Sequence, residues 1–119
     1  DPVQFGGAIE LTGYYLQGNM LTLSWRALET MSANYTVFVQ ALDDNNQLVG
    51  QGDAPPPLPT RYWQVSEQFL TQHKMTSNQP IAVGEYRVIL GWYNTDDLTR
   101  LTTAFADNIF TLPVRLSVP

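Results

Sequence analysis

Residues 21–27 read Leu-Thr-Leu-Ser-Trp-Arg-Ala, and residues 35–42 read Tyr-Thr-Val-Phe-Val-Gln-Ala-Leu. In the first stretch apolar and polar residues alternate one by one, which is the pattern of a strand with one buried face. The second stretch is apolar at nearly every position, and this favours a central strand that is covered on both faces. These two stretches predict an all-β fold.

Further strands are predicted on both sides of this pair. Residues 86–93 are apolar on both faces, residues 111–118 alternate, and an initial strand over residues 8–16 is expected to break near Gly13. Pro113 cannot donate a ladder hydrogen bond, so the last strand should lie at a sheet edge or contain a bulge. Polar turns at residues 17–19, 43–46 and 94–97 separate the strands. We expect one antiparallel, immunoglobulin-like β-sandwich domain over residues 1–119, with about seven to nine strands.

One core should collect the apolar positions that share this spacing. The predicted members are Leu23, Trp25, Val37, Val39, Val88, Leu90, Trp92, Val114 and Leu116. The proline-rich residues 52–63 do not alternate and are expected to form an extended crossover between the two sheets.

Composition excludes several classes of function. The 119 residues include one histidine and no cysteine, which rules out disulfides, thiolate nucleophiles and cysteine-ligated metals. A net charge of −5 argues against nucleic acid and anionic membranes as partners. No apolar run approaches the length of a membrane span, so we expect no direct membrane insertion. The chain begins Asp1-Pro2 without a methionine, and we expect it to be a domain cut from a longer protein or a processed product.

The candidate ligand site follows the prolines, at Arg61, Tyr62, Trp63 and Gln64. Aromatic rings pack well against the C–H face of a sugar, and flanking polar groups would fix its orientation. The same pattern suits a tryptophan that closes one end of the core. The sequence leaves both interpretations open.

Acidic residues gather in two turns, at residues 43–46 and 96–97, while Asp53 and Asp107 stand alone. Such clusters can bind calcium, but Asp and Asn are also the usual turn formers, and no calcium-loop pattern is present. We therefore predict no metal and no cofactor. His73, the one candidate base, lies in a polar run that is expected to be solvated. We predict that the chain is not an enzyme, with a small carboxylate-based hydrolase as the weaker alternative.

Several strings together resemble a known module. They are residues 21–28, residues 35–43 with 49–53, Pro-Thr-x-x-Trp at 59–63, Gly-Glu-Tyr-Arg-Val at 84–88, Gly-Trp-Tyr at 91–93 and Arg-Leu at 100–101. Over residues 9–118 the chain is similar to the C-terminal extracytoplasmic β-sandwich module of bacterial multi-spanning glycosyltransferases of the dolichyl-phosphate-mannose type. This resemblance carries over no catalytic residue.

The resemblance implies a non-catalytic accessory domain that is tethered through a membrane-spanning parent and faces away from the cytoplasm. Such a domain would bind carbohydrate or pack on the parent protein's other domains. The alternative is a purely structural module with no ligand.

Overall fold

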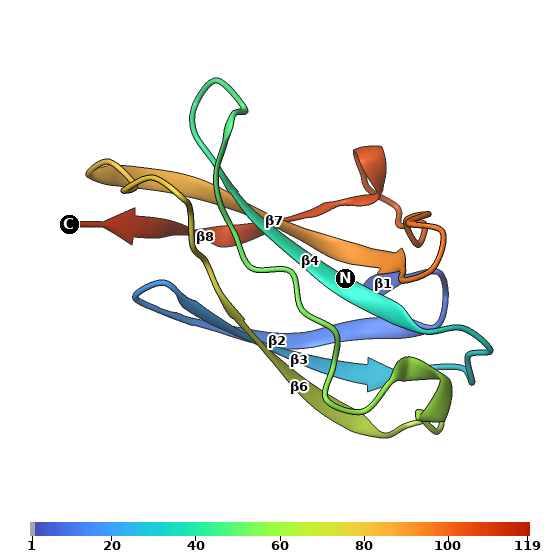
Figure 1. The fold of residues 1–119 in the computed structure, drawn as a ribbon. Helices are drawn as coiled ribbons and strands as arrows, with labels where there is room; N and C mark the ends of the chain where they lie inside the picture. Colours follow the sequence, from blue (N-terminus) through green and yellow to red (C-terminus); the bar gives the residue numbers. More distant parts are fainter. Residues whose placement is uncertain (1) are drawn as a thin grey trace.

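Two antiparallel four-stranded sheets are stacked face to face in the computed structural model, which describes residues 2–119 (Figure 1). One sheet has the order β1-β2-β3-β6, with bounds β1 (Val3–Phe5), β2 (Ile9–Gln17), β3 (Met20–Ala27) and β6 (Gln68–Lys74). The other has the order β5-β4-β7-β8, with bounds β5 (Leu48–Gln51), β4 (Tyr35–Leu42), β7 (Gly84–Asn94) and β8 (Phe110–Val118). Two short 3-10 turns, η1 (Thr60–Tyr62) and η2 (Ala106–Asn108), complete the structure. Nowhere in residues 2–119 is there a helix long and apolar enough to cross a membrane.

The strand order confirms the predicted antiparallel β-sandwich, and its connections resemble those of immunoglobulin-type sandwiches. The hairpins β2–β3, β4–β5 and β7–β8 each stay within one sheet, and the chain changes sheet after β3, β5 and β6. The orders β2-β3-β6 and β5-β4-β7-β8 therefore correspond to strands A-B-E and C′-C-F-G of immunoglobulin-type sandwiches. Eight strands lie within the predicted number, and β4 and β7 are the central pair of their sheet.

A tyrosine corner marks the entry to β7. The Tyr86 hydroxyl donates a 2.7 Å hydrogen bond to the Ala82 carbonyl, four residues upstream. In immunoglobulin-type sandwiches a tyrosine at the start of strand F makes this bond and fixes the corner between the sheets. In antibody domains the second disulfide cysteine lies two residues later, where this chain has the buried Val88.

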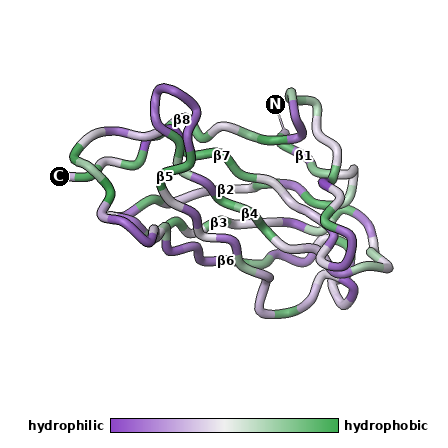
Figure 2. Tube along the Cα trace, turned by 45° about the horizontal axis from the view of Figure 1, so that its top comes forward, coloured by the Kyte–Doolittle hydropathy of each residue, from purple (hydrophilic) through white to green (hydrophobic). Residues whose placement is uncertain are grey.

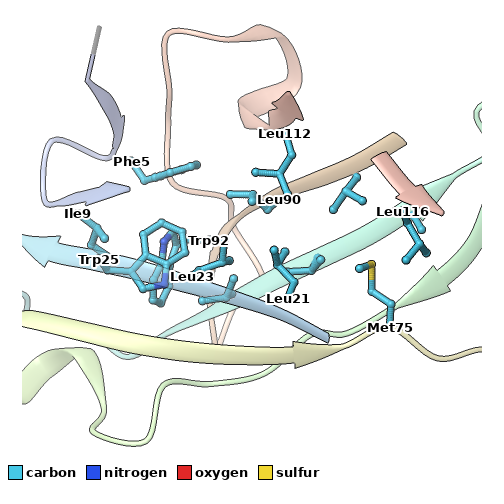
Figure 3. Packing of buried hydrophobic residues seen from close by; sticks show 14 of the residues in the cluster. Phe5, Ile9, Leu21, Leu23, Trp25, Met75, Leu90, Trp92, Leu112 and Leu116 are labelled. Atoms are coloured by element: carbon cyan, nitrogen blue, oxygen red, sulfur yellow. The ribbon is translucent and has the colours of Figure 1, made fainter. Parts of the chain in front are cut away.

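The core lies between the sheets and is built around aromatic rings (Figure 3). Trp25 of β3 and Trp92 of β7 meet edge to face, with ring centroids 4.9 Å apart, and Phe5 packs on Trp25 at 5.8 Å. Eight of the nine predicted core residues are buried, and the exception is Val114. In contrast to the apolar core, the turn between β4 and β5 consists of hydrophilic residues (Figure 2).

Val114 is a correction to the predicted core, because its side chain is 38% exposed. Strand β8 lies at the sheet edge, and its pairing with β7 shifts between Arg87 and Ile89. Their partners are Arg115 and Thr111, so β8 contains extra residues around Pro113. This irregularity, which Pro113 predicted, turns Val114 out of the core and places Leu112 and Leu116 inside.

The proline-rich crossover carries the chain from β5 to β6 in the other sheet, as predicted, but η1 (Thr60–Tyr62) interrupts the predicted extended course (Figure 1). Its first residues still follow the edge of β4. Gly52 donates to the Val39 carbonyl, and Ala54 exchanges both backbone hydrogen bonds with Val37. The crossover is thus fixed along β4 before it reaches η1.

Candidate functional site

Trp63 lies in the core and cannot serve as a sugar platform. It is 1% exposed, its ring stacks on Phe69 at 4.0 Å, and its Nε1 donates to the Leu58 carbonyl at 2.8 Å. The structure therefore corrects this part of the predicted site: Tyr62 and Trp63 do not share an exposed face. Of the two interpretations left open by the sequence, the tryptophan that closes the core is the correct one.

The other three predicted site residues are exposed. The Tyr62 side chain is 55% exposed, and the Arg61 guanidinium lies 4.9 Å from its ring centroid and donates to its hydroxyl at 2.9 Å. The Gln64 backbone N–H donates to Glu67. Arg61 thus covers one face of the Tyr62 ring, which is the one exposed aromatic ring of the predicted site. A binding role for Arg61, Tyr62 and Gln64 remains a prediction.

His73 corrects a second prediction, because it is buried and not solvated. Its two ring nitrogens contact the Gly52 carbonyl and the Thr71 hydroxyl, each at 2.7 Å. Burial lowers the pKa of His73, and the hydrogen bond to Gly52 opposes this shift only in part. The imidazole is therefore a neutral, fully hydrogen-bonded core group.

The acidic turns are held by their own side chains. Asp43 Oδ1 accepts the backbone N–H groups of Asn45 and Gln47, and Asp97 Oδ1 accepts that of Thr99. These are the hydrogen bonds of turn-forming residues. Within residues 2–119 no three His, Cys, Asp or Glu side chains group together as metal ligands would. The prediction that no metal is required is left to experiment.

A hollow of about 300 Å³ lies on the outer face of the β5-β4-β7-β8 sheet. It takes residues from β4, from the crossover, from β7 and from the connection between β7 and β8. Its lining residues are Phe38, Gln40, Asp53, Tyr93, Leu98 and Arg100. We call it the outer-face hollow. It is the candidate functional site because it brings together a carboxylate, a guanidinium, an amide and a phenol.

Phe38 forms a rigid floor under the outer-face hollow. Although it points away from the main core, it is only 2% exposed, since its ring packs on Gly91 of β7. The Arg100 guanidinium lies 4.6 Å from the Phe38 ring centroid and donates to the Asp107 carbonyl at 3.1 Å. Arg100 is therefore positioned by two contacts, a cation–π interaction and a hydrogen bond.

Asp53 is fixed by the edge of β4. Its Oδ1 accepts the Val39 N–H at 3.1 Å, in the place where a neighbouring strand would offer a carbonyl. Desolvation raises the pKa of Asp53, while the Val39 hydrogen bond and the Arg100 charge act in the opposite direction. Burial and the Asp53 charge raise the pKa of Tyr93, and a contact with Thr36 opposes this shift. For both groups burial is the largest cause of the pKa shift, and the charge of a neighbour in the hollow opposes it at Asp53 and adds to it at Tyr93.

Asp53 and Arg100 line the same hollow without bonding to each other. The two ion pairs within 4.0 Å among residues 2–119 are Arg26–Glu10 and Arg115–Asp44. A carboxylate that can accept and a guanidinium that can donate are thus both available to a small polar molecule between them.

The connection between β7 and β8 is strained where it borders the outer-face hollow. Three of the five non-glycine residues with positive φ among residues 2–119 belong to it: Leu98, Asp107 and Asn108. Positive φ is unusual for a leucine, and such residues gather at functional sites. A long connection without regular strands is also a common place for binding residues.

Sequence patterns missed most of this site. Asp53 stands alone among the acidic residues of the sequence, and Phe38, Gln40 and Tyr93 fall within predicted strands. Arg100 belongs only to the strings that carry the resemblance. The one available signal was the length of the connection over residues 95–109.

Comparisons of this chain with models of protein families, with curated proteins and with solved structures gave no significant match in any of the three.

Proposed function

We propose that this chain is a non-catalytic accessory domain that binds carbohydrate in the outer-face hollow. The observation that carries the proposal is that Asp53 and Arg100 lie in one hollow with Gln40 and Tyr93, and that neither forms an ion pair within 4.0 Å among residues 2–119. A sugar ring presents several hydroxyl groups that both donate and accept. A carboxylate, a guanidinium, an amide and a phenol together complement that mixture.

The non-catalytic part of the proposal is supported by the number of carboxylates. Asp53 is the one carboxylate in the lining of the outer-face hollow. Glycoside hydrolysis ordinarily uses two carboxyl groups on opposite sides of the scissile bond. The proposed setting, outside the cytoplasm and attached to a membrane glycosyltransferase-like protein, is supported by the sequence resemblance alone.

The test is binding of a panel of methyl glycosides of neutral, amino and acidic sugars, followed by saturation-transfer NMR. We expect binding at millimolar concentration, and we expect Asp53→Asn to weaken it about tenfold because a charge-assisted hydrogen bond is lost. The asparagine oxygen can still accept the Val39 N–H, so the fold should be retained. Asp44→Asn is the matched control, since the Asp44 side chain is 93% exposed and lies outside the hollow.

Two results would count against the proposal. Absence of binding to every glycoside would leave the purely structural module as the better interpretation. Binding that survives Asp53→Asn but is lost in Tyr62→Ser would place the site at η1 instead.

A second candidate function is packing on a neighbouring domain. It is favoured by the exposed surface between β2 and β8, which we call the seam. Tyr14 pairs with the buried Leu23 and so faces the core side of its sheet, yet it is 41% exposed. A hollow of about 350 Å³, lined in part by Tyr15 and Val114, opens there. Hydrogen exchange at residues 14–16 should be slower in a longer form of the protein than in this chain if the seam is covered.

A further inference from the structure

Strand β6 is an open edge of the β1-β2-β3-β6 sheet (Figure 1). It pairs with β3 over all seven of its residues without a shift in register. The residues that flank it, Glu67 and Met75, both hydrogen-bond to the β3 side, so the odd-numbered residues of this segment bond to β3. The N–H and C=O groups of the even-numbered residues therefore point away from the sheet.

These outward backbone groups are covered only beyond the end of β6. There Thr76 exchanges both backbone hydrogen bonds with Gln51. The crossover then follows β4 in the other sheet, as described above, and leaves the edge of β6 open. The outward groups of Gln68, Leu70 and Gln72 have no backbone partner within residues 2–119.

The other sheet edges are short or interrupted, whereas β6 is neither. Strand β8 contains Pro113 and a register shift, β2 has a bulge between Leu11 and Gly13, β5 has four residues and a register shift, and β1 has three residues. Such features keep strands of different molecules from pairing edge to edge. At the centre of β6 lies Leu70, which is 62% exposed, and the one lysine of this strand, Lys74, is its last residue.

We propose that β6 pairs antiparallel with β6 of a second copy of this chain, so that two four-stranded sheets join into one of eight strands. The two-fold axis passes beside Leu70. Leu70 then lies opposite Leu70 of the second copy, and Gln68 lies opposite its Gln72. Each of these pairs exchanges two backbone hydrogen bonds, which gives about six across the interface.

A second copy suits this edge because the pairing is self-complementary. The Leu70 pair removes two exposed apolar side chains from water, and the amides of Gln68 and Gln72 can both donate and accept. In this register Lys74 lies opposite Ser66 of the other copy and next to its exposed Glu67. Opposite charges therefore meet at both ends of the interface, and no like charges face each other.

This pairing would turn the two outer-face hollows to the same side of the dimer. The two-fold axis of an antiparallel strand pair is perpendicular to the sheet, so both β5-β4-β7-β8 sheets lie on one side of the joined sheet. Their outer faces then point in one direction. This consequence rests on the function proposed above, whereas the pairing does not: a dimer would bind two sugars on one glycan-bearing surface with a gain in avidity.

Sedimentation equilibrium tests the pairing without any ligand. We expect half of the chains to be dimeric at a concentration on the order of 100 µM, because a small interface gives weak association. Leu70→Lys places two like charges opposite each other and should raise the dissociation constant about tenfold. Tyr15→Lys is the matched control, since Tyr15 is 61% exposed in the same sheet, and it should leave the constant unchanged.

A cross-linking experiment locates the two-fold axis, because the chain contains no cysteine of its own. The Cα atoms of a hydrogen-bonded antiparallel pair are about 5.5 Å apart, which is within the range of a disulfide. Under mild oxidation, Leu70→Cys should form a covalent dimer much faster than Tyr15→Cys at the same concentration. In NMR spectra of the wild type, the amides of Gln68, Leu70 and Gln72 should shift as the concentration rises.

The pairing is wrong if the wild type stays monomeric at about 1 mM. It is also wrong if the concentration-dependent shifts leave Leu70 unchanged and gather at Tyr15, because the copies would then meet at the seam. Both measurements use the wild-type chain and hold even if a variant does not fold.

Binding to an immobilised glycoside tests the bivalent arrangement. The methyl glycoside that binds in solution identifies the sugar to be attached to the surface. At about 100 µM chain, the wild type should be retained more strongly than Leu70→Lys, while the soluble glycoside binds both equally well. Equal retention would overturn the bivalent arrangement. If no glycoside binds in solution, the proposed function fails, and sedimentation still decides the pairing.

Discussion

Gly91→Ala should damage the outer-face hollow through one methyl group. Gly91 of β7 pairs with Phe38 of β4, and a Cβ at Gly91 would lie 2.5 Å from two atoms of the Phe38 ring. It would also lie 3.1 Å from the Asn108 carbonyl oxygen. Carbon atoms in contact are normally about 3.5–4.0 Å apart. The Phe38 ring must therefore move by about 1 Å or more. The new methyl group cannot shift away from the ring instead, because it also lies against the Asn108 backbone.

The expected cost is that of an overpacked site, about 1–3 kcal/mol. With a urea m-value of about 1–3 kcal/mol/M, the unfolding midpoint should fall by roughly 1 M. Glycoside binding should weaken as well, because Arg100 rests on the Phe38 ring. Gly13→Ala is the matched control: its nearest neighbour would be Ser24 Cβ at 3.8 Å, an ordinary contact. Neither glycine has a positive φ, so backbone strain does not distinguish them.

Urea titration followed by tryptophan fluorescence measures both midpoints, and the glycoside panel measures binding. We expect Gly13→Ala to match the wild type or exceed it slightly, since alanine lowers the entropy of the unfolded chain. If Gly91→Ala unfolds and binds like Gly13→Ala, Phe38 does not pack on Gly91, and the floor of the hollow is incorrectly described.

Three further predictions concern the core and its corner. Trp63→Ala should lower the free energy of unfolding by about 3–5 kcal/mol, and a loss below 1 kcal/mol would contradict its buried stack. Burial lowers the pKa of His73 in the folded state. The contribution of the neutral ring to stability should therefore be fully present above the ordinary pKa of about 6.5 and should decrease as the pH drops below it. Thermal melting between pH 7.5 and pH 5 should show this decline in the wild type and not in His73→Asn; parallel curves would refute it. Tyr86→Phe removes the bond to Ala82 and should cost about 0.5–1.5 kcal/mol in urea unfolding, whereas an unchanged midpoint would mean that the corner contributes nothing.

The strands could be predicted because each one carries its own periodic pattern. Leu21, Leu23 and Trp25 alternate within a single segment, and their burial needs no knowledge of the rest of the chain. Pro113 likewise predicted the irregular edge strand from its missing N–H. Val114 could not be placed, because a bulge reverses the alternation and its position depends on the partner strand.

Single-residue environments were harder to predict than strands. Trp63 and Tyr62 are adjacent in sequence, yet one is buried and the other exposed, since η1 turns them to different sides. His73 lies in a polar run on an alternating edge strand, where its neighbours face outward while its own side chain faces the core. The outer-face hollow could not be predicted from the sequence for another reason. Its residues Phe38, Asp53 and Arg100 are brought together only by the sheet pairing.

The central claim is that carbohydrate binds in the outer-face hollow, and an NMR titration of the ¹⁵N-labelled chain with the methyl glycoside panel tests it most directly. We predict saturable shifts at millimolar glycoside, concentrated on the amides of Gln40, Asp53, Tyr93 and Arg100 and strongly reduced in Asp53→Asn. The claim is contradicted if no glycoside produces a saturable shift, or if the shifts gather around Tyr62 and leave these four amides unchanged.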